Sequence, residues 1–100
     1  MTPHPLQERE LNLISLYGYC ELAMTPAKFY AKWAVTYEQM ALICSRSDST
    51  VRRWFKRGQD RRHPTHNDMR HLAIMDFLLE HFEAIPPELW MVLCPPNSDT

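Results

Sequence analysis

Apolar residues recur at intervals of three and four along most of the chain, which is the spacing of one face of an α-helix. Short capping side chains and eight prolines interrupt this pattern, whereas glycine occurs only twice. The interruptions divide the chain into five predicted helices, and no segment alternates apolar and polar residues as a β-strand does. The expected fold is therefore all-α, a compact bundle of about five helices.

The N-terminal third of the chain holds two predicted helices. The first covers residues 6–17 or slightly beyond, where leucines and a tyrosine recur at helical spacing. The second covers 27–34, because Thr25 offers a capping hydroxyl and Pro26 fits a first helical turn, where its missing N–H costs nothing. The aromatic residues expected to point inward from this helix are Phe29, Trp33 and Tyr30.

Two short helices lie close together in the middle of the chain. One is expected over 37–44, where Thr36 as the cap and Gln39 three residues later match a capping box. The other is expected over about 48–57, with Ser47 or Asp48 as its cap. Gly58 would close it, since glycine readily adopts the left-handed conformation that ends many helices.

A long predicted helix over 68–84, which begins behind Thr65 or Asn67, dominates the C-terminal third. Its apolar residues cover more than one face, which indicates either a buried central helix or the seam of a dimer. Its acidic residues are expected to face solvent: Asp68, Asp76, Glu80 and Glu83. A pair of prolines ends the helix, and ELWMVLC forms a last short turn. The expected organisation is a single domain over 1–96 with a frayed tail over 97–100.

Charge is unevenly distributed along the sequence. The formal net charge of the chain is −1, yet the segment 46–63 carries seven lysines and arginines against two acids, a net charge of +5. The remaining residues therefore carry a net charge of −6. A cationic segment in an otherwise acidic small domain is typical of a surface that binds a polyanion.

The cationic segment overlaps a helix-turn-helix pattern over 37–57. Two crossing helices need apolar residues where they touch and a small residue where their backbones approach. Ala41 supplies the small residue, while Val51 and Trp54 face back from the second helix, so Trp54 is interpreted as core rather than as a stacking platform for bases. The opposite side of that helix carries a polar and cationic stripe: Ser49, Arg52, Arg53 and Lys56.

This segment resembles the helix-turn-helix of the Cro/repressor-like family of transcription regulators in its alanine at the helix contact, its SxSTV entry and its closing RRWFKRG. With FYAKW ahead and RRHP and LEHFEAIP behind, the chain also resembles small helix-turn-helix proteins common in cyanobacteria. The resemblance implies sequence-specific binding of double-stranded DNA. The base-reading residues that it implies are Ser47, Asp48, Ser49, Arg52 and Arg53. The phosphate-contacting residues that it implies are Arg46, Thr50, Lys56 and Arg57, to which the following basic loop adds Arg61 and Arg62.

Two positions depart from the family pattern. Ser45 stands where the turn usually has glycine, and Arg46 stands where an apolar residue usually follows. A non-glycine residue at a positive φ is strained, so either the turn is wider or the helix continues differently. Arginine suits the reading role independently of the family, because its guanidinium can bond bidentately to guanine O6 and N7 in the major groove.

Other chemistry finds little support in the sequence. The chain has no nucleophile–base pair, glycine-rich phosphate loop or set of metal ligands, so we expect no enzyme activity, no cofactor and no metal. Its three widely spaced cysteines are interpreted as small buried residues rather than redox sensors: Cys20, Cys44 and Cys94. A signal peptide and a membrane-spanning run are both lacking, which favours a cytoplasmic protein without a membrane partner.

The expected partners are double-stranded DNA and a second copy of the chain. One short helix rarely supplies specific binding, so regulators of this kind usually place two copies one DNA turn apart. Two alternatives remain open. The acidic residues outside the basic segment and the apolar ELWMVLC favour a protein-interaction module on a helix-turn-helix scaffold. A transposase-like DNA-recognition domain also fits, since RRWF helices occur there.

Overall fold

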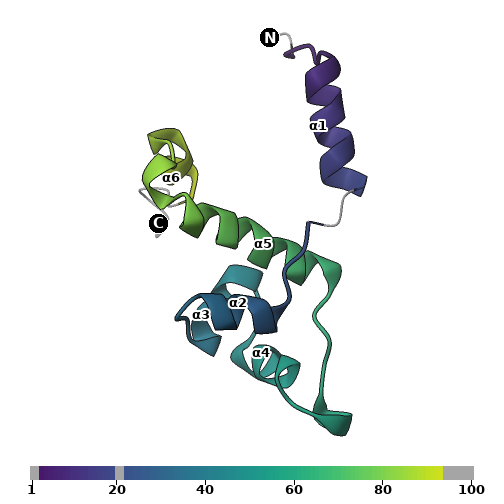
Figure 1. Cartoon of the computed structure of the whole chain (residues 1–100), viewed down its shortest axis with the longest axis vertical. Coiled ribbons are helices and arrows are strands. Elements are labelled where there is room, and N and C mark those ends of the chain that lie inside the picture. The colour runs from purple at the N-terminus through teal and green to yellow at the C-terminus, as the bar shows by residue number, and fades with distance from the viewer. Residues whose placement is uncertain (1–2, 20–21, 94–100) are drawn as a thin grey trace.

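The computed structural model describes residues 3–19 and 22–93. This part of the chain is helical without strands, which confirms the expected all-α bundle (Figure 1). It contains six α-helices rather than about five, because the residues after the paired prolines complete a helix of their own. The helices are α1 (Glu8–Tyr19), α2 (Pro26–Lys32), α3 (Tyr37–Cys44), α4 (Asp48–Trp54), α5 (His66–Glu80) and α6 (Pro87–Leu93). Two short 3-10 helices, η1 (Gly58–Asp60) and η2 (Phe82–Ala84), lie between them.

The core lies between α2, α3, α4 and α5, whose main contacts are α3 with α4, α3 with α5, and α2 with α5. One side of each of these helices forms the core, and each helix contributes only two or three buried residues. The buried apolar residues are Phe29, Met40, Ala41, Cys44, Val51, Trp54 and Leu72. The interpretation of Trp54 as a core residue is therefore confirmed, with 4% of its surface exposed.

Local capping sets the start of α2, and a tertiary contact accompanies its end. Thr25 caps it with Pro26 in the first turn, as expected. It ends at Lys32, two residues before the predicted boundary, and the half-buried Trp33 donates its indole N–H to Asp76 on α5 at 3.0 Å. The prediction that Tyr30 points inward is wrong, because its side chain is exposed at the surface.

The long helix α5 is covered along one face only. Leu72 is completely buried against the core, but Phe77 is 61% exposed, so the interpretation of a fully buried central helix is wrong. The prediction that Asp68 faces solvent is also wrong, since only 2% of this residue is exposed. The helix stops at Glu80, and 3-10 helix η2 takes up part of the predicted length.

The expectation of buried cysteines is confirmed for Cys44, which is 4% exposed. Cys20 and Cys94 lie outside the described residues, as does the predicted tail over 97–100. None of the described helices combines the length and the apolar character that crossing a membrane requires.

The register of α3 gives a direct test of the core. Met40 is fully buried and Leu42 is 80% exposed, although both are large apolar residues on the same helix. We expect Met40→Ala to lower the free energy of unfolding by about 2–5 kcal/mol, since it opens a cavity. The matched control Leu42→Ala should change it by about 0.5 kcal/mol or less. Urea unfolding of the two variants measures both values, and equal losses would contradict this register.

Candidate nucleic-acid interface

Helices α3 and α4 are joined by the tight turn Ser45–Ser47, which makes them a helix-turn-helix. Ser45 adopts the left-handed conformation at φ 56 and ψ 47, and its N–H bonds to the carbonyls of Ala41 and Leu42. Arg46 N–H bonds to the Ala41 carbonyl at 2.9 Å. The serine in the glycine position therefore neither widens the turn nor extends α3, and it bears a strain of about 1 kcal/mol.

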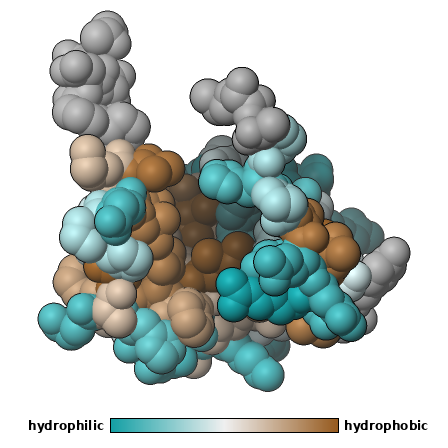
Figure 2. Space-filling model, turned by 90° about the horizontal axis from the view of Figure 1, so that it is seen from above, coloured by the Kyte–Doolittle hydropathy of each residue, from teal (hydrophilic) through white to brown (hydrophobic). Residues whose placement is uncertain are grey.

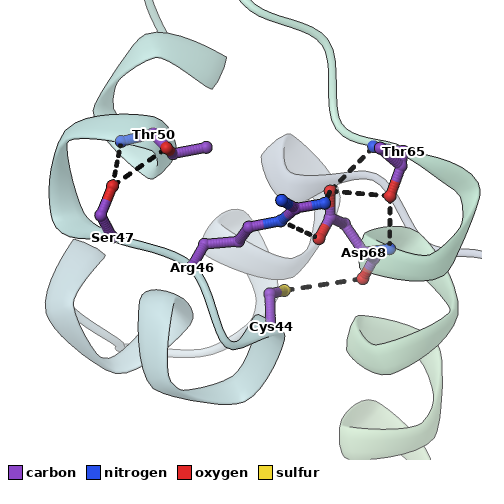
Figure 3. A network of polar contacts seen from close by, with 6 residues as sticks. All are labelled: Cys44, Arg46, Ser47, Thr50, Thr65 and Asp68. Carbon is purple, nitrogen blue, oxygen red and sulfur yellow. Dashed lines mark hydrogen bonds and ion pairs between the residues drawn. The ribbon is translucent and has the colours of Figure 1, made fainter.

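The first turn of α4 is held by hydroxyl groups. Ser47 caps the helix, accepting a bond from the Thr50 N–H at 3.2 Å, and its Oγ also lies 3.0 Å from the Thr50 Oγ1 (Figure 3). The Ser49 hydroxyl lies 3.1 Å from the Ser47 Oγ. The sequence assigned Ser47 to base contact and Thr50 to phosphate contact. In the structure both side chains form hydrogen bonds within the first turn of α4. They set the direction in which α4 leaves the turn.

An ion pair connects this turn to α5. The Arg46 guanidinium donates to both carboxylate oxygens of Asp68, at 2.8 and 3.2 Å (Figure 3). The same carboxylate accepts bonds from the N–H and the hydroxyl of Thr65, at 2.8 and 3.0 Å, and completes the capping box of α5. We therefore remove Arg46 from the phosphate-contacting set, because its guanidinium faces a buried carboxylate within the protein.

The ionisation of these groups matches their contacts. Burial raises the pKa of Asp68, but the hydrogen bonds from Arg46 and Thr65 outweigh it and hold that pKa below its usual value. Bonding to Asp68 also raises the pKa of Arg46. Burial, with a further contribution from the Asp68 charge, raises the pKa of Cys44 to about 11. This thiol donates to the Asp68 carbonyl at 3.6 Å and stays protonated at neutral pH, which suits a structural residue.

The two sides of α4 differ in burial and in chemistry. Val51 and Trp54 are buried against the core. The opposite side, which we call the recognition face, consists of exposed polar and charged residues: Asp48, Ser49, Arg52 and Arg53. The helix-turn-helix thus brings four of the five predicted base-reading side chains together at the surface, and the fifth is the cap.

Arg52 already has partners on α3. Its guanidinium lies 3.3 Å from the carboxylate of Glu38 and 5.7 Å from the ring centroid of Tyr37. Both ends of the ion pair are more than half exposed, and pairs of this kind contribute about 0–1 kcal/mol. Arg52 can therefore exchange Glu38 for another acceptor at little cost.

The predicted stripe through Lys56 is interrupted, because α4 ends at Trp54 rather than near Gly58. The Arg53 carbonyl, which a continuing helix would bond to residue 57, accepts instead from Lys56 N–H at 3.3 Å and from Arg62 N–H at 3.0 Å. Gly58 has a positive φ of 73 as expected, but it begins η1 and does not close α4.

The returning chain places further cations beside the end of α4. The Arg62 N–H bond to the Arg53 carbonyl ties this loop to the helix. We call the exposed cationic residues of the segment the basic margin: Lys56, Arg57, Arg61 and Arg62. The margin and the recognition face are adjacent, and together they account for six of the seven cations of the basic segment.

Three aromatic side chains form a group beside α4 that was not predicted from the sequence. Tyr37 stacks on Phe55 with ring centroids 4.8 Å apart, and Tyr30 lies 5.3 Å from Tyr37 and 5.4 Å from Phe55. These residues come from α2, the start of α3 and the end of α4. No local periodicity links them, so only the packed arrangement of three helices identifies the group. It braces the C-terminal end of α4 against the other two helices.

Comparison with known proteins gives no match: no protein-family model, curated protein or solved structure is significantly similar to this chain.

The Arg46–Asp68 contact should be important for stability. We expect Asp68→Ala to lower the free energy of unfolding by about 2–3 kcal/mol, since it removes the charged hydrogen bonds from Arg46 and the side-chain half of the capping box of α5. The control is Asp60→Ala, which removes an exposed acid of η1 and should change this energy by about 0.5 kcal/mol or less. Urea titration of both variants decides the question, and a loss no larger than that of the control would exclude an anchoring role.

This anchor should also depend on pH. A carboxyl whose pKa is lower in the folded protein stabilises it above the unfolded value of about 3.9. The contribution is lost as the pH falls through the folded pKa. Unfolding energies of the parent protein and Asp68→Asn should therefore differ most near neutral pH and converge between about pH 4 and pH 2. A difference that is constant over this range would show that ionisation of Asp68 does not matter.

Proposed function

We propose that this protein binds double-stranded DNA sequence-specifically and regulates transcription, with α4 entering the major groove. The observation that carries the proposal is the sidedness of α4: Arg52 and Arg53 are exposed while Val51 and Trp54 anchor the helix. A helix with side chains is about 10–12 Å wide, and the major groove is about 12 Å wide. The resemblance of 37–57 to Cro/repressor-like regulators supports the same reading.

Different residues would serve base reading and backbone binding. The recognition face offers two guanidinium groups for guanine O6 and N7, and Asp48 can accept from a cytosine amino group. The basic margin lies beside the end of α4, where the phosphates along the groove would pass. Phosphate contacts position a protein without reading sequence, whereas contacts with base edges specify the site.

Binding should be strongly salt-dependent. If the four residues of the basic margin each neutralise one phosphate, log K should fall against log salt with a slope of about −3.6 for each bound protomer. Random-site selection followed by sequencing tests the proposal as a whole, because it reveals both whether DNA is bound and which bases are read. Recovery of unenriched sequences together with a slope near zero would reject it.

Substitutions of two arginines should distinguish residues that read bases from residues that contact phosphates. We expect Arg53→Ala to weaken binding to the selected site by about 1–3 kcal/mol and to relax preference at one base pair. Arg61→Ala should weaken binding to all sequences alike and reduce the steepness of the salt slope by about 0.9. Fluorescence anisotropy with selected and scrambled duplexes at several salt concentrations distinguishes the two. Identical behaviour of both variants would contradict the assigned roles.

A second candidate function is a protein-interaction module built on the same scaffold. The exposed apolar side chains of α6 favour it: Trp90, Met91, Val92 and Leu93. Under this alternative, duplex DNA at low salt would not shift in a gel, and a defined protein partner would remain bound at high salt. DNA binding that disappears at high salt favours the first candidate.

A further inference from the structure

Helix α1 extends from the side of α5 that lies opposite α4 (Figure 1). It takes part in none of the main helix contacts of the core. Its exposed apolar residues are Leu11, Leu13, Ile14, Leu16 and Tyr17. At 100° per residue these positions span about 220° of the helix circumference. A helix with so broad an apolar surface is normally covered by other protein on more than one side.

An apolar hollow lies where α5 is followed by η2 and α6. Seen from above, hydrophobic residues gather around a hollow in the surface (Figure 2). Side chains of α5 and of the segment after it enclose a cavity of about 290 Å³, among them Phe77, Leu78, Ile85 and Leu89. The adjoining α6 exposes further apolar side chains. The same side of the protein thus carries an uncovered apolar helix and an apolar depression.

Opposite charges mark the two ends of α1. The exposed Glu8 begins the helix. Near its other end, the Arg70 guanidinium stacks on the Tyr17 ring, 4.7 Å from the centroid, and approaches His66 at 3.4 Å. Within residues 3–19 and 22–93, no carboxylate lies in ion-pair distance of Arg70. Two such helices placed antiparallel would bring the acidic start of each to the cationic end of the other.

We propose that α1 pairs antiparallel with the α1 of a second copy of this chain, over the hollow between α5 and α6, in a two-fold dimer. A two-fold interface requires one surface that is complementary to itself. This side of the protein has the projecting helix α1, the hollow that could receive it, and the opposite charges of Glu8 and Arg70. The pairing leaves α4 uncovered in both copies and does not depend on DNA binding.

The exposed apolar area is large enough for an interface with a second copy of the chain. Outside α2, α3 and α4, the described residues expose thirteen large apolar side chains. At roughly 80 Å² each, about half the area of a large side chain, they present roughly 1,000 Å². A standard interface buries about 800 Å² per partner, so this exposed area is enough to supply one.

Sedimentation velocity over a range of protein concentrations tests the pairing. We expect the parent protein to approach twice the 11.9 kDa mass of the chain, and Ile14→Asp to stay at the single-chain mass. Ile14 lies outside the core, so α2 to α5 should stay folded in this variant, which circular dichroism checks. Leu42→Asp, which places the same charge on an exposed leucine of α3, should still dimerise. A parent protein at 11.9 kDa throughout, or a dimeric Ile14→Asp, would overturn the proposal.

Charge reversal tests the antiparallel register. Glu8→Arg and Arg70→Glu should each weaken dimerisation about tenfold, and combining them should restore it to nearly the parent value. A combined variant as weak as either single variant would overturn the antiparallel pairing. Anisotropy with duplex DNA on the same samples keeps the two proposals separate: a dimer without DNA affinity rejects the proposed function alone, and a DNA-binding monomer rejects the pairing alone.

Discussion

The Arg46–Asp68 ion pair joins the turn of the helix-turn-helix to the first turn of α5. The direction of α4 depends on it, because the turn contains only three residues and one of them is strained. Asp68 is buried and cannot be left without a cation at low cost, so its position determines where Arg46 lies. Thr65 binds the same carboxylate, and the start of α5 and the start of α4 therefore share one anchor.

Much of the fold could be predicted from local signals. The start of α3 follows from its capping box, and Thr65 marks the start of α5 by the same chemistry. Predictions were wrong where distant residues decide. The end of α4 depends on a bond from Arg62 to the Arg53 carbonyl, and the burial of Asp68 depends on a partner 22 residues away. Neither contact can be predicted from the periodicity of apolar residues along the chain.

In the candidate interface, too, local signals predicted some features and distant contacts determined the others. Helical spacing places the recognition face correctly, because Val51 and Trp54 anchor the inner side and leave Arg52 and Arg53 outside. The resemblance to a family assigned Arg46 to phosphate contact, and position in a motif does not reveal that this guanidinium binds Asp68 within the protein. The aromatic group around Tyr37 is a product of tertiary packing and carries no sequence signature. Sequence spacing and capping therefore predicted the sides of α4, but not the contacts between segments that lie far apart along the chain.

The position of α1 across α5 from α4 bears on how DNA would be arranged (Figure 1). If two copies pair through that side, the two recognition helices would face outward in opposite directions, so they could not enter neighbouring grooves of one straight duplex. A palindromic operator would then be unnecessary, because each protomer would read a single unrepeated sequence. Two occupied sites on one molecule of DNA would be held together with the intervening segment looped out.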